Sequence, residues 1–414
     1  MKRMILTAVC LLTLSLQGQV VCDSAWRGDV KTVQLYRPGA ELEAPLLTMG
    51  GDCRLVLEFD VLRTESEELQ WHIAHCDRHW VRDGLESVEF MTGFAEGSID
   101  EHDFSFTTLR DYVHYRSVLP DGFASFTHSG NYVLTVTSEE LGDTLLTRRF
   151  RVSEQSVKVR AEVTRPYDGI ALDRRQEVDV RIESGAWGLG SRPDYLEVVV
   201  QQNGRLDNMR ELAFSGYDDG ALAYRQRQQN IFDGGNTFRY FDCSNLRTPM
   251  YNVARVEEYG GEKFVLLRPE EDRSRKHYST ETTLNGGMKV NIWDRQNPRL
   301  EADYVWVNFS LPMTQPMLEG SVYIVGALTD WRLDEGSRMD YNPTHKAYTK
   351  RLLLKQGYYA YQLLVARPHS STAAMTATLE GDHREAPNRY TIYIYQHSPS
   401  DRADRLLAVQ RVMP

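Results

Sequence analysis

Apolar and polar side chains alternate with a period of two along most of this 414-residue chain. The clearest runs, rich in β-branched and aromatic residues, are residues 54–61, 131–136, 195–200 and 390–395. This period places successive side chains on opposite faces of a strand, whereas an amphipathic helix repeats its apolar residues every three to four positions. Many short strands bounded by turn residues therefore predict an all-β chain of β-sandwiches in series, with little helix.

The length and composition of the chain allow more than one such sandwich. Hydrophobic residues make up 41% of the chain, which is enough for several separate cores. We expect a first domain at residues 26–153, a second at 157–299 and a third at 302–414. No low-complexity linker separates them, so we expect the domains to dock on one another.

The N-terminus has the layout of a secretory signal peptide. Two basic residues precede an apolar run at residues 5–16, and the chain turns polar at residues 17–19. An apolar run of about a dozen residues is too short to span a bilayer, and no later run is long and apolar enough. We expect a signal peptide at residues 1–22, and an exported protein without a lipid anchor because Cys22 lacks a small residue before it.

The charge of the chain excludes some classes of partner. Acidic side chains outnumber basic ones by 58 to 48, which gives a formal net charge of −10. Nucleic acid and anionic membrane surfaces attract basic proteins, so neither is expected to bind here.

Residues 71–80 concentrate two tryptophans, three histidines and a cysteine. The side chains that could bind a metal ion are His72, His75, Cys76 and His79. In a strand, positions 72 and 75 point to opposite faces, so these ligands do not converge as a zinc site requires. We therefore interpret the segment as a packed strand that leads into a turn at Asp77, with Trp71 and Trp80 as anchors of the first domain.

Cysteine usage does not indicate a disulfide framework. Four cysteines remain after removal of the signal peptide, namely Cys22, Cys53, Cys76 and Cys243. Cys53 and Cys76 flank a predicted hairpin, but the alternation places them on opposite faces, which argues against a disulfide between them.

Sequence motifs of common enzymes are absent. The chain has no Gly-x-Ser-x-Gly, no His-Glu-x-x-His, no glycine-rich phosphate loop and no dinucleotide fingerprint. We expect no catalytic residue, no cofactor and no metal ion. An exported metal enzyme that uses residues 71–80 stays as a minor alternative.

Residues 321–365 resemble the early-set immunoglobulin-like (Ig-like) module of glycogen-binding proteins. The matching pieces are a strand, a glycine and Asp330-Trp331, then a strand, Gly357 and a Tyr-x-Tyr strand. In the sugar-binding members, exposed tryptophans stack on glucose, and Trp331 matches the first of these. No second aromatic stands at the expected place, so packing of Trp331 is the preferred interpretation, with α-glucan binding as the alternative.

The whole chain resembles the plug protein of the type IX secretion system. The matching segments are residues 57–62, 75–80, 90–97, 112–115, 119–120, 129–132, 236–242, 301–304, 323–331, 354–361 and 380–383. The signature residues, which we expect to be structural, are Trp71, His75, Cys76, Trp80, Tyr112, His114, Tyr115, Gly130, Asn131, Tyr132, Phe238, Arg239, Asp242, Asp330, Trp331, Gly357 and Tyr361.

The resemblance implies a role without catalysis. Such proteins sit in the periplasm and close the periplasmic opening of the large outer-membrane translocon β-barrel when no substrate is in transit. The expected partner is therefore this barrel, to which the chain binds as a monomer. The resemblance also implies the fold, namely β-sandwich domains of the Ig-like and early-set kind.

Overall fold

The computed structural model describes residues 20–52, 54–120, 122, 124–183, 192–367, 373–398 and 401–414. Strands β1 to β30 are the main secondary structure of this part of the chain, and its three α-helices have four residues each. The predicted all-β fold is therefore confirmed. Most of the predicted signal peptide, and Cys53, lie outside the described residues. None of the described helices is long and apolar enough to cross a membrane.

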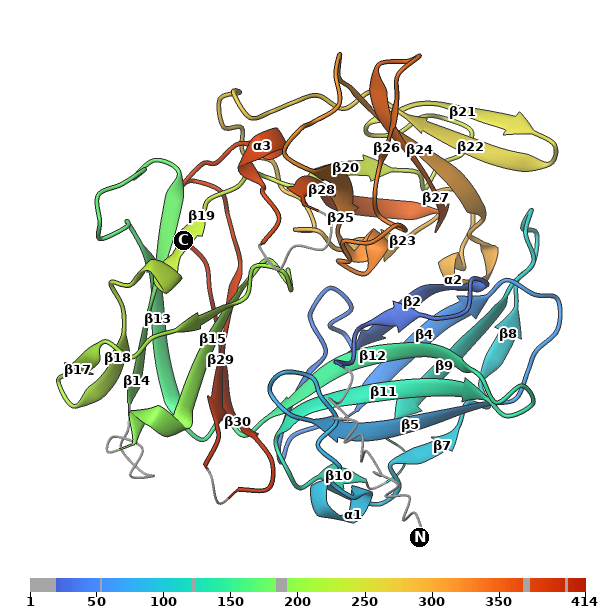
Figure 1. The fold of residues 1–414 in the computed structure, drawn as a ribbon. Coiled ribbons are helices and arrows are strands. Elements are labelled where there is room, and N and C mark those ends of the chain that lie inside the picture. Colours follow the sequence, from blue (N-terminus) through green and yellow to red (C-terminus); the bar gives the residue numbers. More distant parts are fainter. Residues whose placement is uncertain are drawn as a thin grey trace, which may run out of the picture.

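Unit 1 is a sandwich of two sheets, antiparallel except for the pair β3–β12, and it lies at the lower right of Figure 1. One sheet has the order β1-β12-β11-β5-β7, with β3 beside β12, and the other has the order β2-β4-β9-β8. Their facing side chains form one core that runs from Val30 to Val152. Its elements are β1 (Ser24–Ala25), β2 (Val30–Tyr36), β3 (Leu46–Thr48), β4 (Leu55–Val61), β5 (Leu69–Cys76), α1 (Ser87–Phe90), β6 (Met91–Thr92), β7 (Glu96–Ser98), β8 (His102–Phe104), β9 (Val113–Leu119), β10 (Ser125–Phe126), β11 (Gly130–Ser138) and β12 (Thr144–Ser153).

The sequence predicted a hairpin flanked by Cys53 and Cys76, and this prediction is wrong. Strand β4 pairs with β2 and β9, whereas β5 pairs with β11 and β7 in the opposite sheet. The connection between them therefore crosses from one sheet to the other. Alternation reveals which face of a strand is buried, but it does not reveal which strand lies beside it.

Unit 2 is the sandwich at the left of Figure 1, and two distant parts of the chain build it. One sheet has the order β13-β14-β18-β17, with β19 beside β14, and the other has the order β16-β15-β29-β30. Its elements are β13 (Lys158–Thr164), β14 (Arg175–Glu183), the 3-10 helix η2 (Pro193–Tyr195), β15 (Leu196–Gln202), β16 (Arg210–Leu212), β17 (Gly216–Asp218), β18 (Ala221–Tyr224), η3 (Gln228–Asn230), β19 (Ile231–Asp233), β29 (Tyr390–Gln396) and β30 (Arg405–Val412).

Unit 3 is inserted between the two parts of unit 2 and lies at the top of Figure 1. One sheet is built around β28, which pairs with β20, β23 and β25, and the other has the order β21-β22-β24-β27-β26. Its elements are β20 (Arg239–Asp242), β21 (Val253–Tyr259), β22 (Glu262–Leu267), β23 (Met288–Val290), α2 (Pro298–Glu301), β24 (Tyr304–Pro312), β25 (Ser321–Val325), η4 (Ala327–Thr329), β26 (Asp340–Asn342), β27 (Ala347–Lys355), β28 (Gly357–Ala366) and α3 (Ala377–Glu380).

The sheets do not follow the expected border between residues 299 and 302. Strands β20 to β23 precede this border but pair within unit 3, and β29 and β30 follow it but complete unit 2. The Gly234-Gly235 pair lies between β19 of unit 2 and β20 of unit 3. Gly234 passes so close to two backbone carbonyls that a Cβ there would lie 2.3 Å from the oxygen of His383.

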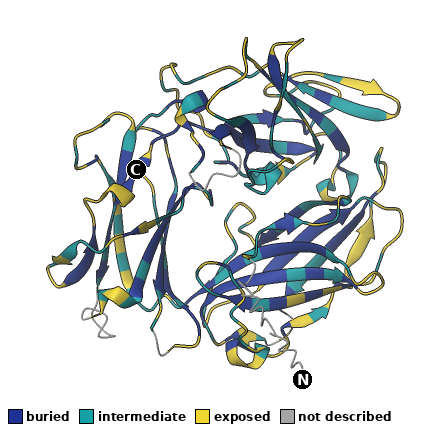
Figure 2. Ribbon diagram, in the orientation of Figure 1, coloured by how far each residue is buried: buried dark blue, intermediate teal, exposed yellow. Residues whose placement is uncertain are grey.

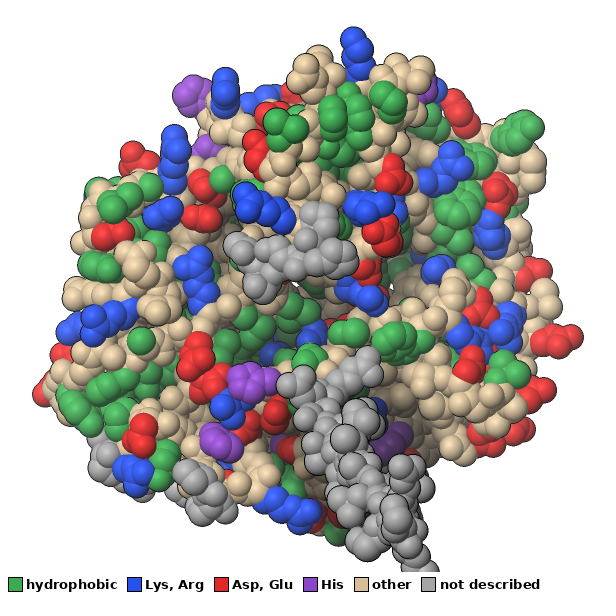
Figure 3. All heavy atoms as spheres, in the orientation of Figure 1, with side chains coloured by type: hydrophobic (Ala, Val, Ile, Leu, Met, Phe, Trp, Pro, Cys, Tyr) green, Lys and Arg blue, Asp and Glu red, His purple; other side chains and the backbone are tan. Residues whose placement is uncertain are grey.

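Burial follows the same three-unit plan. The strands of each unit are buried where the two sheets face each other, and the tip of the β21–β22 hairpin is exposed (Figure 2). The three units surround a common centre, and the face shown in Figure 3 is hollowed there. The contacts at this centre hold the three units together.

Candidate functional site

The joint between units 1 and 3 is built around Asp60 of β4, whose side chain is almost fully buried. Its Oδ2 atom accepts hydrogen bonds from Lys355 Nζ of β27 and from the hydroxyl of Tyr304 in β24, both at 2.6 Å. Its Oδ1 atom lies 2.7 Å from His114 Nδ1 of β9. All four groups are buried, so this carboxylate is satisfied entirely by protein donors.

Electrostatics at Asp60 follow from these partners. Burial opposes ionisation of the carboxyl group, but Lys355 and His114 outweigh that effect and hold the pKa of Asp60 below its usual range. Burial also lowers the pKa of Lys355, and the Asp60 carboxylate opposes this shift, so each group of the buried pair favours the charged form of the other. Tyr112 reinforces the joint because its ring lies 4.1 Å from Lys355 Nζ, and its hydroxyl donates to the carbonyl oxygens of Arg299 and Ala302.

The joint between units 1 and 2 uses the turn after β5. Arg78 in this turn binds Asp404 through its backbone and its guanidinium group, at 2.8 and 3.2 Å, and also pairs with Glu197 of β15. Asn131 of β11 accepts a hydrogen bond of 2.8 Å from the hydroxyl of Tyr395 in β29. Asn131 also donates to the carbonyl of Asp77 in the turn. It therefore connects this turn of unit 1 to Tyr395 of unit 2.

The histidines and cysteine of residues 71–80 do not form a chemical centre. His72 and His79 are exposed, whereas His75 is buried with its Nδ1 2.5 Å from Asp83. Burial raises the pKa of the Cys76 thiol to about 12, which leaves it protonated and unreactive. Cys22, Cys76 and Cys243 are free, and no group of three potential ligands for a metal ion occurs in the part of the chain that the structure describes.

Glycines make room for the aromatic side chains of unit 1. Gly130, at φ +147°, lies under the His75 ring, where a Cβ would be 2.3 Å from Nε2. The ring of Trp71 covers Gly97, its cross-strand neighbour in β7. Tyr115 accepts a hydrogen bond of 2.8 Å from the backbone of Glu67, and Tyr132 donates one of 2.6 Å to the carbonyl of His128.

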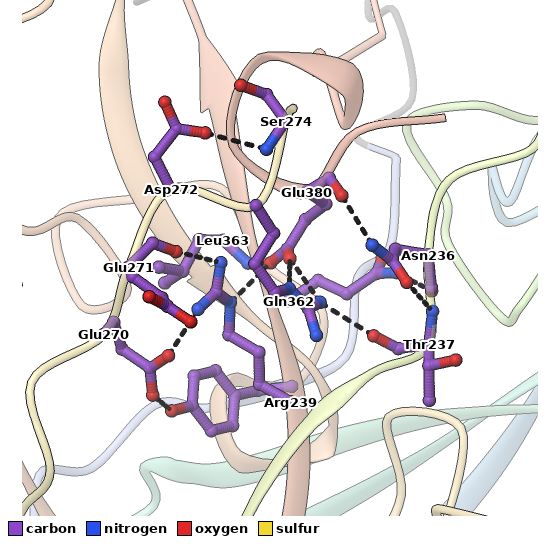
Figure 4. A network of polar contacts seen from close by, with 12 residues as sticks. Asn236, Thr237, Arg239, Glu270, Glu271, Asp272, Ser274, Gln362, Leu363 and Glu380 are labelled. Carbon is purple, nitrogen blue, oxygen red and sulfur yellow. Dashed lines mark hydrogen bonds and ion pairs between the residues drawn. The ribbon is translucent and has the colours of Figure 1, made fainter. Parts of the chain in front are cut away.

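A buried ion network holds unit 3 together (Figure 4). Glu380, which has no exposed side-chain surface, binds Arg239 Nε at 2.9 Å and also pairs with Arg273. Arg239 and Tyr361 both bind Glu270. Burial opposes ionisation of Glu380, but the two arginines hold its pKa below the usual range.

The remaining signature residues of unit 3 also have packing roles. Asp242 accepts a hydrogen bond of 2.8 Å from the backbone of Ser244. Gly357 lies against β23, where a Cβ would be 2.3 Å from the carbonyl oxygen of Lys289.

Trp80 and Trp331 line a cavity of about 300 Å³ where the three units meet. Asp330 and Trp331 adopt positive φ angles of 50° and 58°, and Asp330 forms an ion pair of 3.0 Å with Arg148 of unit 1. The Trp331 ring covers Gly286 and contacts Phe238, with ring centroids 6.1 Å apart. One face of this ring is therefore covered by protein, so it is only part of a stacking platform.

The fold and its joints define an all-β protein of three interlocked sandwiches. Residues 30–154, which correspond closely to unit 1, match the family model described as the type 9 secretion system plug protein first domain. The match supports the family that the sequence resembles for this unit, and it indicates a role in type IX secretion.

One solved structure resembles almost the whole chain. It is a hypothetical protein from Parabacteroides merdae ATCC 43184, with 29% identity, a TM-score of 0.91, and coverage of 96% of this chain and 100% of that one. No curated protein matches the chain.

Two further solved structures are too dissimilar to support an argument. Dimeric latent PorU from Porphyromonas gingivalis has 10% identity, a TM-score of 0.14, and coverage of 93% of this chain and 34% of that one. The C-terminal domain of Streptococcus pyogenes AspA has 7% identity, a TM-score of 0.15, and coverage of 92% and 98%.

Sequence reasoning missed the partners of the signature residues rather than the residues themselves. Asp60, Tyr304 and Lys355 each stand inside a matching segment, but none was singled out. A charged residue at a position that alternation assigns to a strand interior, such as Lys355 after three leucines, is a signal that could have revealed a buried ion pair.

Proposed function

We propose that this chain is a non-enzymatic plug that closes the periplasmic opening of the type IX outer-membrane translocon when no substrate is in transit. The observation that carries the proposal is the match of residues 30–154 to the plug family model. The proposal further includes export by the N-terminal signal, a periplasmic location and binding to the translocon barrel as a monomer.

The architecture supports this role on physical grounds. A protein that blocks a wide pore must resist deformation, and mobile linkers between its domains would let the seal open. Here the units are joined by buried polar groups such as Asp60, Asn131 and Arg148, whose partners lie on neighbouring units. Separating the units would leave these groups without their partners. The free-energy cost is on the order of 3–5 kcal/mol for each charge that stays buried.

Copurification and permeability test the proposal together. A tagged chain expressed in its own host should copurify with the translocon barrel, whereas a periplasmic protein of similar negative charge should not. Deletion of the chain should make the outer membrane more permeable to a normally excluded dye. Absence from the purified translocon, together with unchanged permeability after deletion, would count against the plug role.

The structure gives the α-glucan alternative little support. Trp331 is only partly exposed because Gly286 and Phe238 cover its ring. Stacking on a sugar requires an open aromatic face. Calorimetric titration with maltoheptaose distinguishes the two functions, because the plug function predicts no heat of binding.

A further inference from the structure

The cavity between the three units has the composition of a ligand site. Its volume of about 300 Å³ is at the lower end of the range for small-molecule pockets. Each unit contributes an aromatic side chain to its wall, with Trp80 from unit 1, Tyr393 from unit 2 and Trp331 from unit 3. Nothing in the plug role requires such a cavity.

The charges in this wall do not balance. Three of its five arginines form ion pairs, namely Arg148 with Asp330 at 3.0 Å, Arg149 with Asp23 at 3.2 Å and Arg411 with Glu43 at 2.7 Å. The other two, Arg151 and Arg389, have no carboxylate partner among the described residues.

One acid in the wall also remains without an ion pair among the described residues. This is Glu41, which is exposed to solvent. Two unpaired cations therefore face one solvated anion, so the cavity has an excess of one positive charge.

Arg151 is held rigidly beside the cavity. Its guanidinium group lies between the rings of Trp80 and Tyr393, at 4.7 and 4.0 Å from their centroids. Its Nε and Nη1 atoms donate to the hydroxyls of Tyr395 and Tyr393, at 3.0 and 3.3 Å, whereas Nη2 is buried without a partner. The groups in contact with this cation are neutral aromatic side chains, and the Asp23 carboxylate acts on it only through space. A further anion nearby lowers the free energy of such a desolvated cation.

Arg389 differs from Arg151 because its side chain has no hydrogen-bond partner among the described residues. Its backbone N–H binds Asn203 Oδ1 at 2.8 Å, which fixes the main chain at the cavity wall. Its side chain is half-buried, so its guanidinium group is available to a ligand. Guanidinium groups bind carboxylates through two parallel hydrogen bonds.

We propose that the cavity binds a small organic anion with one carboxylate and a flat apolar part. Arg389 binds the carboxylate, Arg151 supplies the positive potential from between the buried rings of Trp80 and Tyr393, and the apolar part lies against the half-buried ring of Trp331. A single negative charge matches the excess of one positive charge in the wall. This site does not depend on the plug role, and either proposal stands if the other fails.

Calorimetric titration of the full chain with benzoate tests the site. Benzamide has nearly the same shape without the charge, and sulfate is an inorganic anion without the ring. We expect benzoate to bind, the Arg389→Gln variant to bind it at least about tenfold more weakly, and benzamide and sulfate to bind more weakly by a similar factor. The unpaired side chain of Arg389 should make this variant fold normally, which its melting temperature verifies.

The matched control is Arg255→Gln, which changes an exposed arginine that pairs with Glu257 in the outlying hairpin β21–β22. This control should bind benzoate as the unmodified chain does. No heat with benzoate up to about 10 mM, or equal affinity in the Arg389→Gln variant, would overturn the proposal. Equal binding of benzamide would exclude recognition of a carboxylate, and equal binding of sulfate would exclude an organic ligand.

Discussion

A carboxylate inside a protein loses the water that stabilises its charge, so its protein partners must replace that water. Asp60 obtains them from Lys355, Tyr304 and His114, two of which belong to another unit. The same pattern recurs at Glu380, which two arginines neutralise. At the residue scale, signature residues such as His114 and Arg239 therefore supply partners for buried carboxylates.

Replacement of Lys355 by methionine tests this interpretation. The variant leaves the Asp60 carboxylate buried without its lysine partner, so we expect the free energy of unfolding to fall by about 3–5 kcal/mol. Urea denaturation measures the change. Lys276→Met is the matched control because Lys276 forms an exposed pair with Glu271, and its loss should cost less than about 1 kcal/mol. Similar effects of the two variants would contradict a dominant role of the buried pair.

Asp179 of β14 behaves in the opposite way. Burial and the nearby carboxylates of Glu177 and Glu162 raise the pKa of Asp179 from 3.8 to about 7. Between these two pH values the folded chain holds a proton that the unfolded chain has released, so stability falls as pH rises from about 4 to 7. Above pH 7 this contribution to stability is lost.

We expect Asp179→Asn to remove this pH dependence and to stabilise the protein by roughly 1–2 kcal/mol at pH 8. Chemical denaturation at a series of pH values provides the measurement. Asp219→Asn, at a side chain that is 95% exposed, should leave the pH profile unchanged. A destabilised Asp179→Asn variant at pH 8 would show that the charged form is required.

At the scale of elements, the sequence revealed the strands but not their neighbours. The runs at residues 54–61 and 390–395 coincide with β4 and β29, because alternation reports the burial of each face and is a local property. Pairing of β29 with β15 joins segments almost 200 residues apart. Neither period nor spacing contains that information, so the inserted arrangement of unit 3 could not be predicted from one sequence.

Truncation at Arg389 tests the pairing of these distant strands. It removes β29 and β30, and with them the buried residues Ile392, Ile394 and Leu407 of the core of unit 2. We expect residues 158–233 to become sensitive to protease while unit 1 stays protected, as measured by limited proteolysis with mass spectrometry. Removal of only Met413 and Pro414, which follow β30, should have no effect. Equal protection of residues 158–233 in both truncations would be inconsistent with a sheet completed by the C-terminus.

At the scale of the whole molecule, the three units share their stability. Polar groups of each unit are satisfied by the others, as at Asp60, Asn131 and Arg148. Unfolding of one unit would leave partners in its neighbours buried without hydrogen bonds, which couples the three transitions. Chains with several domains often unfold in separate steps, so coupling of this strength has a measurable signature.

Differential scanning calorimetry should therefore show one transition for the full chain. The ratio of the calorimetric to the van't Hoff enthalpy should be close to 1, as two-state unfolding requires. In the Lys355→Met variant the joint between units 1 and 3 is weakened, and the ratio should rise. Resolved transitions in the unmodified protein would mean that the joints are too weak to couple the units.

The insertion of unit 3 into unit 2 also governs the order in which the protein can be made. A chain that emerges N-terminus first can close unit 1 early, because all of its strands precede residue 154. One edge of β15 in unit 2 stays unpaired until residues 390–412 have been synthesised, which happens after unit 3. The half-built sheet is therefore the part of the nascent chain most exposed to aggregation until β29 and β30 have emerged.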